Sequence, residues 1–149
     1  MLFRSNEFKR LYQIHCNDKT GPYPGIIELL RELKKHNIKM GIATNKVKSA
    51  ADKLNEIYFE GLIDEVAGVE DGIIPKPDRC MIDNLMKRLN ATTDETLYVG
   101  DSQVDVATAG NTGLDMVAVL WGFRTRKELE ESGAMVFIDD PMEILDKVL

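Results

Sequence analysis

The sequence has 149 residues, enough for one domain with a sizeable core, and its residues are 44% hydrophobic and 30% charged. These proportions and a mean hydropathy of -0.22 are ordinary for a globular protein and exclude disordered, collagen-like and low-complexity classes. Nineteen Lys and Arg against 25 Asp and Glu give a net charge of -6, which argues against a protein that binds the backbone of DNA or RNA.

Amphipathic helices and short apolar strands alternate along nearly the whole sequence. A helix face is indicated where apolar residues recur at helical spacing, as in Ile26, Leu29, Leu30 and Leu33. Helices are predicted at about 26–33, 47–57, 81–89, 103–110 and 125–132, and after Pro141. Strands are predicted at 38–43, 63–67, 96–100, 115–120 and 134–138, with a loop rich in Gly and Pro over 68–78.

This order predicts an α/β fold. Alternating strands and helices form right-handed β-α-β units, which build a Rossmann-like, mostly parallel sheet with helices on both faces. Ligands bind beyond the carboxyl ends of the strands in such sheets. The residues that directly follow each strand are therefore the candidates for a functional site.

The sharpest motif follows the strand at 96–100. Gly100 lets the backbone approach a ligand closely, and Asp101 and Asp105, at i and i+4, are expected to share one helix face. Carboxylate oxygens at a strand end suit Mg²⁺, which takes one or two carboxylates together with phosphate and water. The alternative is that Asp101 caps the following helix and Asp105 is a solvated surface acid.

Two other loops carry candidate phosphate ligands. Thr44 and Asn45 end the strand at 38–43, where a hydroxyl, an amide and nearby N–H groups suit phosphate oxygens at the start of a helix. An ordinary helix cap is the alternative there. Lys76 lies between two prolines that restrict the backbone, and would give a fixed positive charge for a phosphoryl group unless it is merely solvated.

Together these motifs carry a family resemblance that runs from about residue 8 to the end. Residues 22–46 and 98–114 resemble the phosphoglycolate phosphatase branch of the haloacid dehalogenase-like hydrolase superfamily almost phrase by phrase. The second, third and fourth motifs of that superfamily are matched by Thr44-Asn45, Lys76-Pro77 and Gly100-Asp101-Ser102-x-x-Asp105. The resemblance implies a Mg²⁺-dependent phosphomonoester hydrolase that acts on a small phosphorylated metabolite through an aspartyl-phosphate.

The resemblance also implies roles for the matched residues. Thr44 would hydrogen-bond the phosphoryl oxygens, with Asn45 beside it. Lys76 would neutralise charge between the phosphate and the nucleophile. Asp101 would bind Mg²⁺ directly, and Asp105 would support the metal through water or intervening hydrogen bonds.

The first motif of the family, an apolar strand ending in Asp-x-Asp, is absent from the sequence. Residues 1–20 resemble the last helix of the family's helical cap, so we expect a remnant of the cap over 1–20 and the α/β core over 21–149. That core would lack the family's first central strand. Because the motif carries the nucleophile, the chain alone is expected to be inactive or weakly active.

The missing strand predicts a gap of roughly 10 Å between the strands at 38–43 and 96–100, twice the ~4.8 Å strand spacing. There are three ways to resolve this gap. The two strands pair directly, a second copy of the chain supplies the missing strand, or the native protein is longer and contains that strand itself. The start at Met1–Ser5 fits a helix entered partway and favours the longer protein. We expect the stretch before Phe8 to have no role in the centre of the sheet.

Two functions stay open at this point. One is the hydrolase, whose active unit needs a motif that is absent here; the other is a non-catalytic module that keeps the phosphate and Mg²⁺ half-site for binding or scaffolding. The hydrolase requires the gene to encode an apolar strand ending in Asp-x-Asp, in frame and upstream of Met1, whereas the module does not. A phospho-receiver domain has a similar sheet, but its acceptor aspartate and N-terminal acids are not present.

Cysteine usage and hydropathy bear on location and partners. Cys16 and Cys80 lack metal or redox spacing and fit reduced thiols in a cytoplasmic protein. The longest apolar runs have five or six residues, far short of the ~20 that span a bilayer. We therefore expect neither a membrane nor a nucleic acid as partner, while the vacant central position favours a homo-oligomer.

Overall fold

The computed structural model describes residues 2–3 and 22–149, and in it strands and helices alternate as predicted. The strands are β1 (Leu2–Phe3), β2 (Gly41–Val47), β3 (Glu65–Val69), β4 (Leu97–Gly100), β5 (Asp115–Val119) and β6 (Phe137–Ile138). The helices are α2 (Ile26–Lys35), α3 (Lys48–Tyr58), α4 (Cys80–Leu89), α5 (Gln103–Thr112), α6 (Arg126–Glu131) and α7 (Leu145–Val148). Short 3-10 helices are η2 (Thr93–Glu95) and η3 (Pro141–Ile144).

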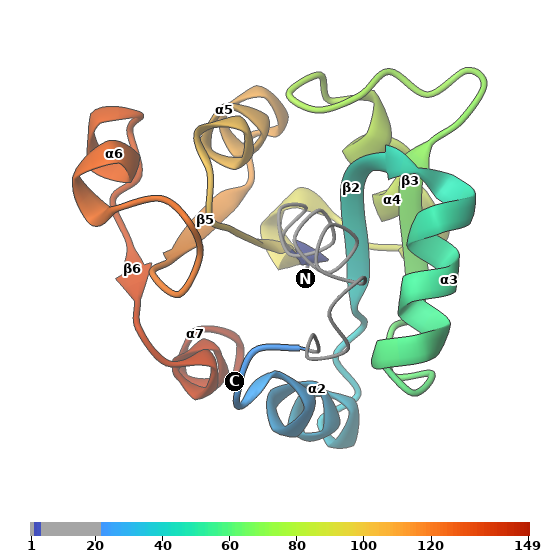
Figure 1. Cartoon of the computed structure of the whole chain (residues 1–149), viewed down its shortest axis with the longest axis horizontal. Coiled ribbons are helices and arrows are strands. Elements are labelled where there is room, and N and C mark those ends of the chain that lie inside the picture. Colours follow the sequence, from blue (N-terminus) through green and yellow to red (C-terminus); the bar gives the residue numbers. More distant parts are fainter. Residues whose placement is uncertain (1, 4–21) are drawn as a thin grey trace.

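The strands form one parallel sheet in the order β3-β2-β1-β4-β5-β6 (Figure 1). β1 occupies its centre, where Leu2 pairs with Gly41 of β2 and with Tyr98 of β4. The expectation that the stretch before Phe8 has no central role is therefore wrong, and the predicted gap is filled by a two-residue strand. The backbone of β1 thereby pairs with strands on both sides in the interior of the sheet.

The range predicted as a remnant of a cap, 1–20, is described only at Leu2–Phe3, which belong to the sheet. Residues 4–20 lie outside the described residues, and so does Cys16. The cap interpretation of those residues stays a prediction. Among the helices that the structure describes, none is long and apolar enough to cross a membrane.

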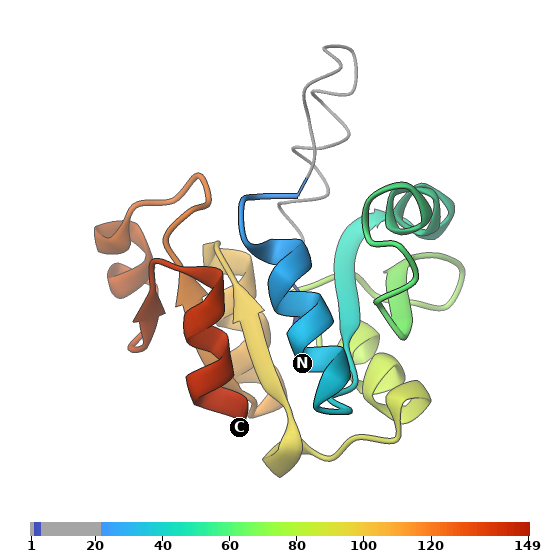
Figure 2. The same ribbon diagram turned by 90° about the horizontal axis from the view of Figure 1, so that it is seen from below.

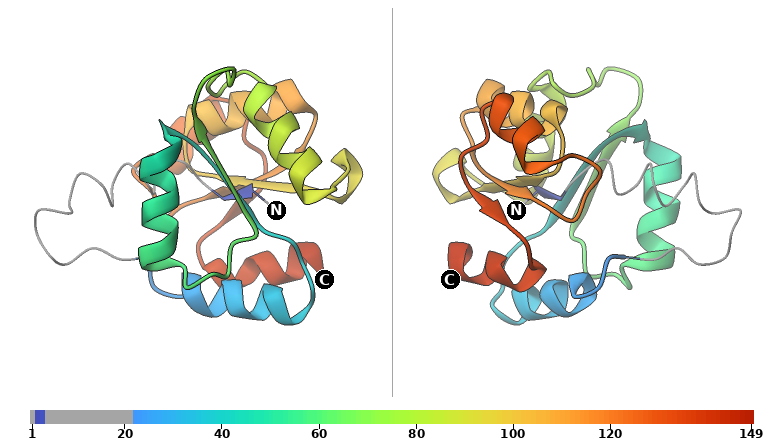
Figure 3. Two further views of the ribbon diagram at one scale, coloured as in Figure 1. Left: turned by 90° about the vertical axis from the view of Figure 1, so that its right-hand side faces the viewer. Right: turned by 60° about the vertical axis from the view of Figure 1, so that its left-hand side comes forward.

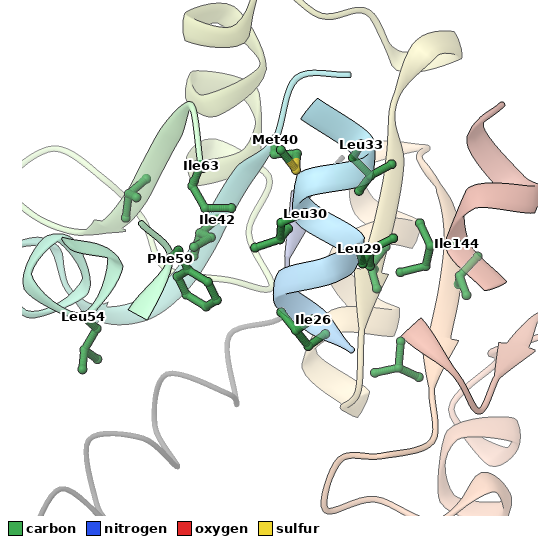
Figure 4. Close-up of a cluster of buried hydrophobic side chains, with 14 of the residues drawn as sticks. Ile26, Leu29, Leu30, Leu33, Met40, Ile42, Leu54, Phe59, Ile63 and Ile144 are labelled. Atoms are coloured by element: carbon green, nitrogen blue, oxygen red, sulfur yellow. The ribbon is translucent and has the colours of Figure 1, made fainter. Parts of the chain in front are cut away.

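One face of the sheet is covered by α2, α3 and the C-terminal η3–α7 segment. Figures 2 and 3 show α2 and α7 lying side by side on this face. The amphipathic pattern of α2 explains its position, because its four buried apolar residues all point into the core (Figure 4). These four are the residues from which the helix was predicted: Ile26, Leu29, Leu30 and Leu33.

The opposite face is covered by α4 and α5 (Figure 3), over a second apolar cluster. Successive strand residues alternate between the two clusters, so that Tyr98 of β4 packs with the α4–α5 side and Val99 with the α2–α3 side. This alternation turns the Tyr98 side chain toward the face on which the loop after β3 and the start of α5 meet.

The predicted elements are confirmed along the chain, and the largest difference lies at the end of β2. The strand was expected over 38–43 but runs over Gly41–Val47, with a register shift against β3 between Ala43 and Val47. Helix α3 begins at the next residue, and its N-cap residue is Val47. The helix-cap alternative for Thr44 and Asn45 is therefore wrong.

Candidate functional site

The candidate site lies at the carboxyl ends of β2, β3 and β4, and its β2 residues belong to the strand itself. The structure joins Asn45, Lys76, Asp101 and Asp105 in one hydrogen-bonded network and places Thr44 next to it in β2. Thr44 is buried, and its hydroxyl accepts from the N–H two residues further on at 3.2 Å. A hydroxyl that accepts there keeps its own hydrogen, which suits a phosphoryl oxygen.

Asn45 ties the loop after β3 to the end of β2. Its side-chain N–H donates to the C=O of Lys76, and its side-chain oxygen accepts from the N–H of Lys76, both at 2.8 Å. The following Lys76-Pro77 peptide bond is cis. Because both polar atoms of the amide engage Lys76, we assign Asn45 to positioning that lysine, and its contact with a substrate stays a prediction.

The ammonium of Lys76 is part of a buried triangle with Asp105 and Tyr98. The Lys76 and Asp105 side chains are both 0% exposed. Lys76 Nζ donates to Asp105 Oδ1 at 2.9 Å and to the Tyr98 hydroxyl at 3.1 Å, and that hydroxyl donates to the same oxygen at 2.8 Å. The alternatives of a solvated lysine and a solvated Asp105 are therefore wrong.

Burial and charge shift the pKa values in this triangle. Burial alone would raise the pKa of Asp105, but the charge of Lys76 and the hydrogen bonds it receives hold that pKa below its ordinary value. Burial, followed by the negative charge of Asp105, raises the pKa of Tyr98 well above its ordinary value. At neutral pH the triangle therefore contains an ionised carboxylate and a neutral phenol.

The turn that leads into α5 is built around the other oxygen of Asp105. Oδ2 accepts from the N–H of Asp101 at 3.1 Å, from the N–H of Ser102 at 3.2 Å and from the Ser102 hydroxyl at 2.9 Å. That hydroxyl accepts in turn from the Asp105 N–H at 3.3 Å, which completes a capping box. Asp105 thus uses both oxygens to hold the turn and the lysine, which suits a supporting role.

Asp101 lies before the N-cap residue Ser102 and outside α5. The expectation that Asp101 and Asp105 share one helix face is therefore wrong, and so is the alternative that Asp101 caps the helix. The side chain of Ser102 is the better cap because it reaches the N–H of Asp105 in the first turn. Asp101 therefore lies at the strand end, directly after β4 and before the N-cap residue of α5.

Two glycines let the carboxylates lie directly against the backbone. A Cβ at Gly100 would lie 2.4 Å from the Cβ of Asp105. A Cβ at Gly122, which follows β5, would lie 2.1 Å from Asp101 Oδ2. Both distances are too short for any real side chain, so these positions require glycine if Asp101 and Asp105 keep their places.

The donor set fits Mg²⁺. Asp101 is 1% exposed, and its Oδ2 lies close to the backbone at Gly122. Within residues 2–3 and 22–149 no three His, Cys, Asp or Glu side chains gather into a metal cluster. An ion here would depend on Asp101, substrate phosphate and water, a ligand set that Mg²⁺ commonly takes.

Sequence reasoning missed Tyr98, Ser102 and Gly122. Strand alternation places Tyr98 on the same face as Gly100, and this signal could have found it. The spacing of Ser102 and Asp105, three residues apart before a helix, is a capping-box signal of the same kind. Gly122 has no local signal, because the residue that it lies against, Asp101, follows a different strand.

Comparisons with known proteins agree with this architecture. A family model described as haloacid dehalogenase-like hydrolase matches residues 3–119. The phosphoglycolate phosphatase of Rhodospirillum rubrum is 36% identical over 121 residues, which cover 79% of this chain and 49% of that protein. Pyrophosphatase PpaX of Bacillus mycoides is 28% identical over 141 residues, which cover 93% of this chain and 65% of that protein.

A solved structure extends the comparison to the fold. The crystal structure of a proposed phosphoglycolate phosphatase from Lactobacillus delbrueckii subsp. bulgaricus has a TM-score of 0.87 and 37% identity, covering 95% of this chain and 59% of that one. This chain spans about half the length of the curated phosphoglycolate phosphatases that it matches. The family model covers most of the sequence, and the chain belongs to the haloacid dehalogenase-like hydrolase family.

Proposed function

We propose that this chain forms the core of a Mg²⁺-dependent phosphomonoester hydrolase of the phosphoglycolate phosphatase type. The observation that carries the proposal is the buried network in which Lys76, Asp105 and the turn at Asp101 meet beyond the strand ends. A buried ammonium beside a buried carboxylate suits a small anion with a bound cation. The names of the relatives support phosphate esters or anhydrides as the substrate class.

Each residue has a physical task in this proposal. The Thr44 hydroxyl and the N–H groups at the start of α3 hold phosphoryl oxygens. The Lys76 ammonium offsets the negative charge of the phosphoryl group, and Asn45 keeps that lysine in place. Asp105 orients both the lysine and the turn that presents Asp101.

Asp101 would hold the Mg²⁺ ion, with phosphate and water completing its ligands. When bound, the ion supplies positive charge that polarises a phosphoryl oxygen. The chain's own contribution is to keep the Asp101 carboxylate buried and fixed against Gly122. A small phosphorylated metabolite in the cytoplasm remains the proposed substrate and setting.

The sequence has no Asp-x-Asp, so the nucleophile of the covalent route has no counterpart within these 149 residues. We therefore expect little or no turnover from the chain alone. The same observation favours the second candidate, a non-catalytic module that binds phosphate and Mg²⁺. An in-frame coding sequence upstream of Met1 for an apolar strand ending in Asp-x-Asp supports the hydrolase, and its absence supports the module.

Turnover of p-nitrophenyl phosphate by the purified chain, with Mg²⁺ and with EDTA, tests the expected inactivity. Asp101→Ala is compared with Asp115→Ala, an exposed aspartate at the amino end of β5, away from the site. We expect no Mg²⁺-dependent turnover from the wild-type chain or from either variant. Turnover that disappears in EDTA and in Asp101→Ala alone would contradict this and reveal a surrogate nucleophile.

A further inference from the structure

We propose that Tyr98 is a positioning residue of the phosphoryl site, with its hydroxyl fixing the ammonium of Lys76. This goes beyond the motif residues, and its phosphate-binding consequence rests on the proposed function. The proposal stands on geometry, because Tyr98 comes from β4 while Lys76 comes from the loop after β3. The two side chains meet only because the sheet brings these segments together.

The hydroxyl of Tyr98 is engaged in both directions. It accepts from Lys76 Nζ at 3.1 Å and donates to Asp105 Oδ1 at 2.8 Å. Nζ also lies 5.8 Å from the centre of the Tyr98 ring, at the outer range of a cation–π contact. Tyr98 is 0% exposed, so water does not replace the hydroxyl in this role.

A closed triangle restrains a lysine more than a single ion pair does. Lysine has a flexible four-carbon stem, and one acceptor leaves its ammonium free to swing around that acceptor. A second acceptor in a different direction removes this freedom. Of the three ammonium hydrogens, the described residues direct one to Asp105 and one to Tyr98, and these two bonds together fix the direction of the third.

A phenylalanine at this position would fill the same space in the α4–α5 cluster without the hydroxyl. Tyr98→Phe is therefore the test variant, and Tyr58→Phe is the matched control. Tyr58 is half-buried at the end of α3 and packs against the other core cluster. The control removes the same group from a partly buried tyrosine that has no part in the lysine triangle.

The first measurement needs no ligand. Nitrogen-15 NMR of the lysine ammonium groups reports how fast their hydrogens exchange with water, with the Lys76 signal assigned by its loss in Lys76→Arg. In the wild-type chain Lys76 is expected to exchange more slowly than Lys127, whose side chain is 84% exposed. Tyr98→Phe should speed exchange at Lys76, and Tyr58→Phe should not.

The second measurement is the affinity for inorganic phosphate in the presence of Mg²⁺. Loss of one hydrogen bond to the ammonium should weaken binding about tenfold in Tyr98→Phe and leave Tyr58→Phe unchanged. If Lys76 exchange and phosphate affinity are both unaltered in a folded Tyr98→Phe, the residue is merely structural and the proposal is overturned.

The two arms separate this inference from the proposed function. Slow exchange at Lys76 that is lost in Tyr98→Phe, without phosphate binding by the wild-type chain, would support the positioning role and overturn the proposed function. If Tyr98→Phe does not fold, the rate of hydrogen exchange at the Lys76 ammonium of the wild-type chain tests the positioning role. A Lys76 ammonium that exchanges as fast as that of Lys127 would then overturn the positioning role directly.

Discussion

Lys76→Met is expected to lower the free energy of unfolding by about 3–5 kcal/mol, the usual effect of removing one partner of a buried ion pair. Methionine is close to lysine in length and leaves no large cavity, so the loss of stability reports the removal of the charge rather than a change in packing. Asp105 would be left as a buried carboxylate whose remaining donors are neutral. Urea unfolding at pH 7 measures the effect.

The pH dependence gives this prediction its signature. In the wild-type chain the pKa of Asp105 is lowered, so its contribution to stability is present above the unfolded value of about 3.8 and is lost as the pH falls through the folded pKa. In Lys76→Met the effect of burial is expected to dominate and to raise the pKa of Asp105. Lowering the pH then protonates the carboxylate and removes the cost of burying an unpaired charge. The difference between the two proteins should therefore shrink as the pH falls toward 4.

Two controls sharpen the measurement. Arg79→Met removes the cation of an exposed pair, with side chains 61% and 41% exposed, and should change stability by at most about 1 kcal/mol. Lys76→Met combined with Asp105→Asn removes both charges and should recover part of the loss. A Lys76→Met protein as stable as Arg79→Met, with an unaltered pH profile, would contradict the buried pair.

Gly100→Ala is expected to destabilise the protein by about 1–3 kcal/mol, the typical effect of forcing a methyl group into a packed site. The new Cβ would lie 2.4 Å from Cβ and 2.5 Å from Cγ of Asp105. Asp105 does not move aside easily, because its carboxylate accepts hydrogen bonds from Lys76, Tyr98 and the turn before α5. Thermal and urea unfolding measure the loss.

Gly110→Ala is the matched control and should have the opposite sign. Gly110 lies in α5, and a Cβ there would meet nothing within 4 Å. Alanine has the higher helix propensity, so this variant should gain about 0.5–1 kcal/mol. Equal stabilities for the two variants would contradict the close approach of Asp105 to Gly100.

Much of the fold was predictable because its signals are local. Leu29, Leu30 and Leu33 mark α2 by spacing alone, and the apolar run at 96–100 marks β4 in the same local way. β1 was not predictable, because two residues carry no periodicity. Its identity depends on pairing with Gly41 and Tyr98, far away in the sequence.

In the candidate site, too, the residues with local sequence signals were predictable and the contacts between distant segments were not. Asp101 and Lys76 were predicted because one directly follows a strand and the other lies in a restricted loop. Thr44 was predicted because it follows the apolar run at 38–43, although β2 continues to Val47. Their connections were not, since the Tyr98 hydroxyl reaches Lys76 across the fold and Asn45 binds the lysine backbone rather than standing free. Contacts between distant segments follow from the packing of the sheet, and no local pattern encodes them.

The central claim, that this edge of the sheet binds phosphate with Mg²⁺, is tested most directly by titration calorimetry of the folded chain with inorganic phosphate. Asp101→Asn is the test variant and Asp115→Asn the control. We expect phosphate binding that requires Mg²⁺, that weakens at least about tenfold in Asp101→Asn and that is unchanged in the control. No binding to the wild-type chain, or equal affinity in all three proteins, would contradict it.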